Sequence, residues 1–136
     1  MTLEQLIRHL PALFAALLVA ILFIQSGLDK VVDWKGNLEW ITGHFSKTFL
    51  APTVPIMFVT LTVMELATGI LAAAGIVYFF AIGSTTAMFY ASVLGALSIT
   101  ALFFGQRVAK DYAGAAVLIP YFILMLFLMV LTTPRT

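Results

Sequence analysis

The residues with the clearest chemical potential are a lysine and a glutamate associated with long apolar runs. Lys30 closes one apolar run together with Asp29, and Glu65 lies in the middle of the next. An ionised carboxylate deep in an apolar environment is costly, so either a cation approaches it or it stays protonated. Ionisable residues inside a membrane are functional hypotheses by default. Glu65 and Lys30 are therefore predicted as a catalytic, proton-handling pair, and a purely structural role is the alternative.

Other polar residues could join this pair in a small amphipathic pocket that opens to the bilayer. Gln25 and Asp29 share one helical face, because residues four apart stack. Ser26 and Lys30 share the neighbouring face for the same reason. The predicted ligand-binding residues are Gln25, Ser26, Asp29, Thr68, Arg107 and Tyr112.

The chemistry of such a pocket suits a head group with carbonyl or hydroxyl oxygens on an apolar tail, which describes a quinone. Lys30 and Arg107 have long stems that could lean inward, and either could donate to one oxygen. Glu65 would exchange a proton with the ligand. A neutral Glu65 could instead donate a hydrogen bond to Gln25, Ser92 or a threonine on a facing helix.

The elements that position these residues follow from composition. The chain has 136 residues, of which 62% are hydrophobic and 10% charged, with a mean hydropathy of +1.11. Its charge-free intervals are residues 9–28, 48–64, 66–106 and 112–134. The third interval, as one helix, would reach about 60 Å at the standard rise, about twice the apolar thickness of a bilayer. That interval must fold back on itself, so the chain is predicted to cross the membrane four times.

The predicted fold class is all-α, an integral membrane four-helix bundle formed by a single transmembrane domain of residues 1–136. Residues 1–9 are expected to lie along the membrane, and the chain reverses between Gly75 and Gly83. Residues 34–50 form an interfacial amphipathic helix in the first connection, with Asn37 as its cap. The four spanning helices are placed near residues 10–30, 53–74, 83–104 and 113–131.

Composition also excludes several classes of function. The net charge of +1, with no basic run, gives no indication of nucleic-acid binding. The absence of cysteine excludes disulfides, thiol redox catalysis and thiolate-held metal or iron-sulfur centres within this chain. His9 and His44 lie in interfacial segments and lack the spacing of haem or metal ligands. We therefore expect no covalent or metal-bound cofactor and no enzymatic activity by the chain alone.

Three short motifs resemble the DoxX family of small four-helix membrane proteins. The segment from Phe23 to Lys30 resembles the family's F-x-x-x-G-x-x-K signature, with Gly27 in place, and Glu65-Leu-Ala-Thr-Gly69 resembles its E-x-x-x-G motif. Lys110-Asp-Tyr-Ala-Gly114 resembles the polar start of its fourth helix. The resemblance implies a role close to quinones, since the family includes proteins similar to the small membrane component of thiosulfate:quinone oxidoreductase. More distant relatives are similar to endoplasmic-reticulum cargo receptors.

The sequence therefore predicts a DoxX-like membrane subunit that binds a quinone or similar lipid-soluble molecule and works with a redox partner protein or as a homo-oligomer. A non-catalytic structural or accessory subunit of a larger membrane complex is the alternative. A small transporter is a third reading, disfavoured because four helices leave little room for alternating access. The expected location is a bacterial-type inner membrane. The termini are placed outside the cytoplasm, because the loop side carries five basic residues against two.

Overall fold

The computed structural model describes residues 1–134, and within that range the chain is helical and contains no strand. Four of its helices are long and apolar enough to cross a membrane. The predicted all-α fold, a bundle of four membrane-compatible helices, is confirmed. In chain order the elements are α1 (Leu3–Val32), α2 (Trp34–His44), the 3-10 helix η1 (Ala51–Thr53), α3 (Val54–Ile82), α4 (Thr86–Val108) and α5 (Tyr112–Thr132).

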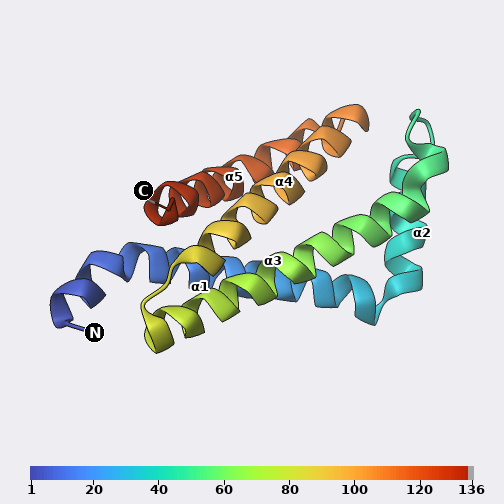
Figure 1. Ribbon diagram of the computed structural model, residues 1–136. Coiled ribbons are helices and arrows are strands. Elements are labelled where there is room, and N and C mark those ends of the chain that lie inside the picture. The colour runs from blue at the N-terminus through green and yellow to red at the C-terminus, as the bar shows by residue number, and fades with distance from the viewer. Residues whose placement is uncertain (135–136) are drawn as a thin grey trace.

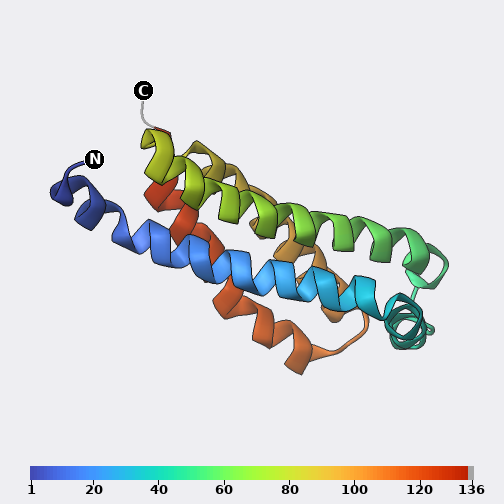
Figure 2. The same ribbon diagram turned by 90° about the horizontal axis from the view of Figure 1, so that it is seen from below.

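The four long helices pack in a sequential arrangement. α1 packs mainly on α3, α3 on α4, and α4 on α5, while α1 touches α5 less extensively. α2 lies across one end of the bundle, so that it is seen nearly along its own axis in Figure 2 (Figures 1 and 2). The start of α1 and the end of α5 lie at the opposite end.

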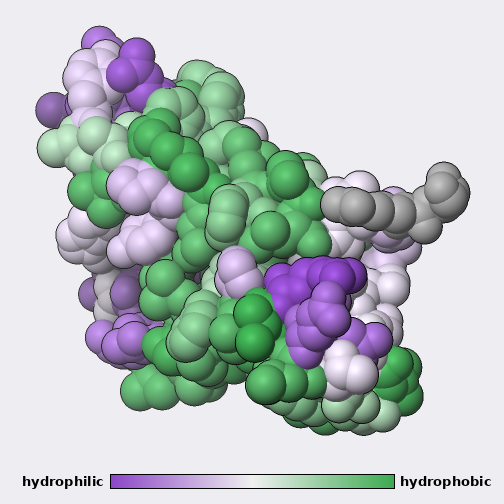
Figure 3. All heavy atoms as spheres, turned by 90° about the vertical axis from the view of Figure 1, so that its left-hand side faces the viewer, coloured by the Kyte–Doolittle hydropathy of each residue, from purple (hydrophilic) through white to green (hydrophobic). Residues whose placement is uncertain are grey.

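The outer surface of the long helices is apolar, as lipid contact requires. Large side chains such as Phe14, Ile70 and Ile123 are more than half exposed. Figure 3, which views the molecule from the end that carries the termini, shows many hydrophobic residues, with hydrophilic residues gathered in separate patches. The buried side of the helices is lined largely by small residues, including Ala16 and Ala72. The four helices therefore turn large apolar side chains outward and pack closely through small ones.

The first helix begins earlier than the sequence predicts. Thr2 and Gln5 form a reciprocal capping box, with the Thr2 hydroxyl accepting from the Gln5 amide at 3.1 Å and the Gln5 side chain accepting from the Thr2 amide at 3.0 Å. This cap starts α1 at Leu3, and the helix continues through Pro11. The expected separate segment of residues 1–9 is therefore part of α1.

The reversal expected between Gly75 and Gly83 lies further along the chain. α3 continues through Gly75 and ends at Gly83, which has a φ of 71° and donates from its amide to the Phe79 carbonyl at 2.8 Å. Gly75 has a packing role, because a Cβ there would lie 2.9 Å from the backbone nitrogen of Met88 on α4. The left-handed conformation needed to end a helix is thus supplied by the second glycine.

The interfacial helix is shorter than expected and has a different cap. α2 spans Trp34–His44, and the Asp33 carboxylate caps it by accepting from the Gly36 amide at 3.3 Å. Asn37, the predicted cap, instead donates from its side chain to the Asp29 carbonyl at 3.1 Å and the Asp33 carbonyl at 2.8 Å. A single residue, Asp33, therefore joins α1 to α2 and fixes the sharp change of direction between them.

Candidate functional site

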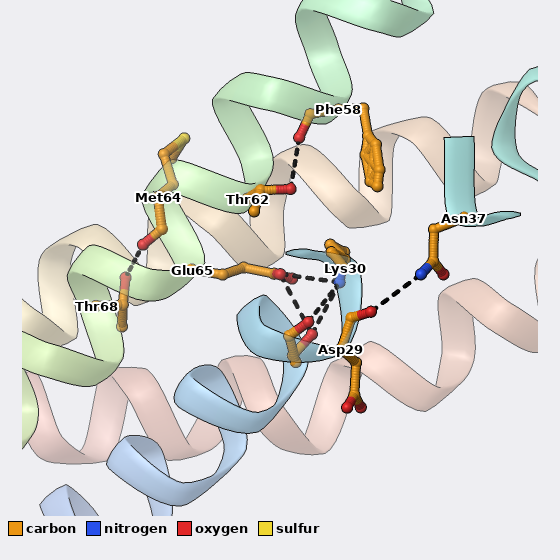
Figure 4. A network of polar contacts seen from close by, with 9 residues as sticks. Asp29, Lys30, Asn37, Phe58, Thr62, Met64, Glu65 and Thr68 are labelled. Atoms are coloured by element: carbon orange, nitrogen blue, oxygen red, sulfur yellow. Dashed lines mark hydrogen bonds and ion pairs between the residues drawn. The ribbon is translucent and has the colours of Figure 1, made fainter. Parts of the chain in front are cut away.

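The structure brings the predicted catalytic pair into direct contact. The Lys30 ammonium lies 2.9 Å from Oε2 of Glu65. Ser26 connects them, donating from its hydroxyl to Glu65 Oε2 at 3.2 Å and accepting from Lys30 Nζ at 2.9 Å (Figure 4). The Glu65 side chain is 3% exposed and that of Lys30 is 21% exposed. We call Ser26, Lys30 and Glu65 the lysine cluster, and its members balance charge and share hydrogen bonds inside the bundle.

Close helix contact builds this cluster. Ser26 and Lys30 lie one turn apart on α1, and Glu65 faces them from α3. A Cβ on Gly69 would lie 2.7 Å from the Ile24 backbone nitrogen, and a Cβ on Gly27 would lie 2.5 Å from Leu66 Cδ2. Glycine at these two positions lets the α1 and α3 backbones approach until the short Ser26 side chain reaches the carboxylate.

The buried hydroxyls around the cluster are bonded within their own helices. Thr68, a predicted ligand-binding residue, donates to the Met64 carbonyl at 2.7 Å, and Thr62 donates to the Phe58 carbonyl at 2.8 Å (Figure 4). Ser92 donates to the Phe89 carbonyl. The expected hydrogen bond from Glu65 to Gln25, Ser92 or a threonine is therefore replaced by the contacts with Ser26 and Lys30.

The other predicted ligand-binding residues lie away from the lysine cluster. Gln25 and Asp29 are exposed on the outer side of α1, and the Asp29 carboxylate points away from Lys30 and Glu65 (Figure 4). Arg107 places its guanidinium 4.4 Å from the centre of the Tyr112 ring, as a cation–π pair. The structure thus brings together Ser26, Lys30 and Glu65, but not the remaining polar residues.

A cavity of about 520 Å³ lies under α2, between α3 and α4, and one of its lining residues is Lys30. Its walls are mainly apolar. The apolar wall residues include Trp40, Ile41, Phe45, Met57, Phe58, Leu61, Met64 and Leu102. The polar lining residues include Asn37, His44 and Gln106. The cavity therefore combines apolar walls with polar groups at a few positions, which is the usual composition of a small-molecule site.

Glu65 lies behind Lys30 and does not itself line this cavity. Because the Lys30 nitrogen contacts both Glu65 and Ser26, its orientation is set from inside the bundle. Of the lysine cluster, Lys30 is the residue that lines the cavity, and Glu65 contacts it from the bundle interior.

The sequence reasoning missed the polar group at the other side of the cavity. His44 Nε2 lies 2.7 Å from Oε1 of Gln106 and 3.8 Å from Oδ2 of Asp111. Trp40 stacks on the His44 ring, with centroids 4.8 Å apart. A sequence signal did exist, because Asn37, Trp40, Ile41 and His44 recur at the spacing of one helical face. All four residues line the cavity.

Within residues 1–134 the structure holds no group of three or more His, Cys, Asp or Glu residues that could bind a metal ion. Hydrogen bonding and charge are therefore the chemical means that the described site residues offer.

The fold and the site together define a multi-pass helical membrane protein with a buried lysine–glutamate pair beside an amphipathic cavity. Comparison of the chain with family models, curated proteins and solved structures found no match. The resemblance to the DoxX family remains a prediction from the three motifs.

Proposed function

We propose that this protein is a DoxX-like membrane subunit that binds a quinone-type molecule in the cavity under α2. The observation that carries the proposal is an apolar cavity whose lining includes an ammonium group held by a buried carboxylate. Its volume of about 520 Å³ lies within the range of small-molecule sites. An apolar ring would occupy the walls, and a ring oxygen would accept a hydrogen bond from Lys30.

The proposed division of roles follows from what each side chain touches. Lys30 would bind the ligand oxygen with the donor that now makes its longest contact, 3.4 Å to the Ser26 carbonyl. The other two donors would stay on Glu65 Oε2 and the Ser26 hydroxyl, both at 2.9 Å. Glu65 and Ser26 would keep that ammonium oriented and balance its charge. The contacts of Glu65 support proton exchange only through Lys30 or Ser26, because the carboxylate lies behind them.

Electron transfer would require a partner in this proposal. The chain contains no cysteine, and the described residues include no metal-binding cluster. A redox partner protein would therefore supply the cofactor, and the present chain would supply the quinone site. The same resemblance supports a bacterial-type inner membrane as the location.

The proposed orientation places the α2 end of the bundle on the cytoplasmic side. Lys35, Lys47, Arg107 and Lys110 belong to that end, together with Lys30, whereas Arg8 and Arg135 are near the termini in sequence. Because Lys30 is paired inside the bundle, the basic count is four against two. This excess still favours termini outside the cytoplasm under the positive-inside rule.

The two tryptophans of the chain provide a test of ligand binding. Trp40 lines the cavity, and Trp34 stacks on the lining residue Phe58 with ring centroids 4.3 Å apart. Purified protein in lipid nanodiscs would be titrated with a short-tailed benzoquinone, and tryptophan fluorescence would be recorded. We expect saturable quenching that weakens in the double variant Lys30→Met/Glu65→Met and is retained in Lys35→Met. Quenching without saturation, or saturation unchanged in the double variant, would overturn the proposal.

The double variant also addresses the second candidate, a non-catalytic accessory subunit. This candidate is favoured by one observation, the contacts of Glu65 Oε2 with both Lys30 and Ser26 within the bundle. Replacing a buried ion pair by apolar residues of similar volume is often neutral for stability. A double variant that folds but loses quinone binding supports the quinone site. A wild-type protein that folds and binds no quinone supports the accessory role.

A further inference from the structure

The cavity has a second polar side, and its hydrogen bonding fixes how it can contact a ligand. The amide oxygen of Gln106 can only accept, so His44 Nε2, at 2.7 Å, must carry the proton of that hydrogen bond. Nδ1 is then an acceptor in the neutral ring and a donor in the protonated ring. His44 lines the cavity, and with Nε2 bonded to Gln106 its other ring nitrogen would be the one to serve a ligand, in either hydrogen-bonding role.

The groups that hold the His44 ring come from two parts of the chain. Asp111, in the link between α4 and α5, places Oδ2 at 3.8 Å from Nε2 and also caps α5 by accepting from the Gly114 amide at 2.9 Å. On α2 itself, Trp40 covers one ring face and Phe45 meets the ring edge-on. The ring is thus fixed by stacking, one hydrogen bond and a nearby carboxylate.

The two polar groups line the same cavity. Lys30 lies in the last turn of α1 and His44 at the end of α2, and both are among the lining residues. A six-membered ring with oxygens at opposite positions presents one polar atom in each of two opposite directions. A single ring in this cavity would therefore have one oxygen for Lys30 and another for His44.

We infer that the ligand carries two oxygens at opposite positions of its ring, and that His44 is the specificity-determining contact for the second oxygen. Lys30 contacts the first oxygen, so this inference rests on the proposed function and names its ligand class more narrowly. A ligand with one oxygen, such as a sterol or a fatty alcohol, would use only the Lys30 side. His44 would select the oxidised ring by donating to its carbonyl, or the reduced ring by accepting from its hydroxyl.

Paired probes and matched variants test this assignment. The probes are 2-methyl-1,4-naphthoquinone, which has two opposite carbonyls, and 1-tetralone, which has a bicyclic skeleton and one carbonyl. Their affinities would be measured by tryptophan quenching in nanodiscs for wild type, His44→Phe and His9→Phe. Phenylalanine keeps the stacking on Trp40 and removes both ring nitrogens. His9 is the matched control, because it packs on Phe79 at the other end of the molecule.

We expect His44→Phe to weaken binding of the naphthoquinone by about tenfold, the effect of one hydrogen bond, with tetralone binding unchanged. His9→Phe should bind both probes as wild type does. If wild type binds the naphthoquinone and His44→Phe binds it equally well, or loses both probes equally, the role of His44 is overturned and the proposed function stands. If wild type binds neither probe saturably, the proposed function fails as well.

A second variant covers the case in which His44→Phe does not fold. Gln106→Leu removes the partner that orients His44 and leaves the histidine in place. It should weaken naphthoquinone binding by less than about tenfold, because His44 is still present, and leave tetralone binding unchanged. Equal effects of Gln106→Leu on the two probes would contradict the assignment.

Discussion

The lysine cluster and the His44 side of the cavity solve the problem of holding a polar group in a lipid environment in different ways. Glu65 is 3% exposed, between two spanning helices, and its charge is matched by Lys30. His44 lies on a helix across the end of the bundle, and its carboxylate neighbour Asp111 is 35% exposed. The first region needs a complete internal partner set, whereas the second can share its polar contacts with water.

The backbone contacts of the two regions also differ, and those around the lysine cluster are the closer ones. Around the lysine cluster, Gly27 and Gly69 bring α1 and α3 together with no space for a side chain. α2 has no comparable contact at Gly43, where a Cβ would meet nothing within 4 Å. It is anchored instead by Phe45, which is buried and reaches Gly105 of α4. The closest backbone contacts of this comparison therefore lie between α1 and α3, whereas α2 covers the cavity through looser contacts.

Removing one member of the buried pair should have the largest effect. Lys30→Met leaves Glu65 buried without a cation and should lower the free energy of unfolding by about 3 kcal/mol. Lys30→Met/Glu65→Met removes both charges and should stay within about 1 kcal/mol of wild type. Unfolding by SDS in mixed micelles, followed by circular dichroism, measures both values. A double variant as unstable as the single one would show that the ion pair itself, and not the unpaired charge, determines stability.

Crowding the α1–α3 contact should have the next largest effect. Gly69→Ala places a methyl group 2.7 Å from the Ile24 backbone nitrogen, so the helices must separate. We expect a loss of about 2 kcal/mol, measured by the same unfolding experiment. Gly43→Ala is the control, because its Cβ meets open space and alanine favours a helix. Similar stabilities of the two variants would contradict the close contact.

Loss of the cap between α1 and α2 should have a smaller effect. Asp33→Ala removes the acceptor for the Gly36 amide and should cost about 1 kcal/mol. Asp29→Ala removes an exposed carboxylate four residues earlier and should change stability by less than about 0.5 kcal/mol. Because Asp33 positions α2 over the cavity, its variant should also weaken quinone quenching, whereas Asp29→Ala should not. Equal quenching in the two variants would contradict the role of Asp33 in positioning α2 over the cavity.

The sequence predicted the bundle, and it named Lys30 among the cations that could approach Glu65, because both follow from the cost of charge in an apolar medium. Charge-free intervals located the four long helices, and the one deep acid called for either a nearby cation or protonation. The reversal was misplaced because two glycines bounded the candidate turn. A glycine that ends a helix and a glycine that allows close packing cannot be told apart in the sequence. The position of Met88 on α4 shows that Gly75 is the one that serves packing.

The sequence analysis also missed the cavity and His44, because both depend on contacts between distant parts of the chain. It considered His44 only as a possible haem or metal ligand, and so passed over the helical face that it shares with Asn37. The contact of His44 with Gln106 joins residues 62 positions apart, so no local spacing indicates it. Conversely, Arg107 and Tyr112 were placed in the site by charge and ring type, and they pair with each other instead.

Photolabelling would locate the quinone on the protein itself. A short-tailed azidoquinone would be activated in nanodiscs, and the labelled residues would be mapped by mass spectrometry with and without excess unlabelled quinone. We expect competed labels on cavity residues of α2 and α3, such as Trp40, Met57 and Met64, and uncompeted background on lipid-facing residues such as Ile123. Labels confined to lipid-facing residues, with none removed by competition, would contradict a quinone site beneath α2.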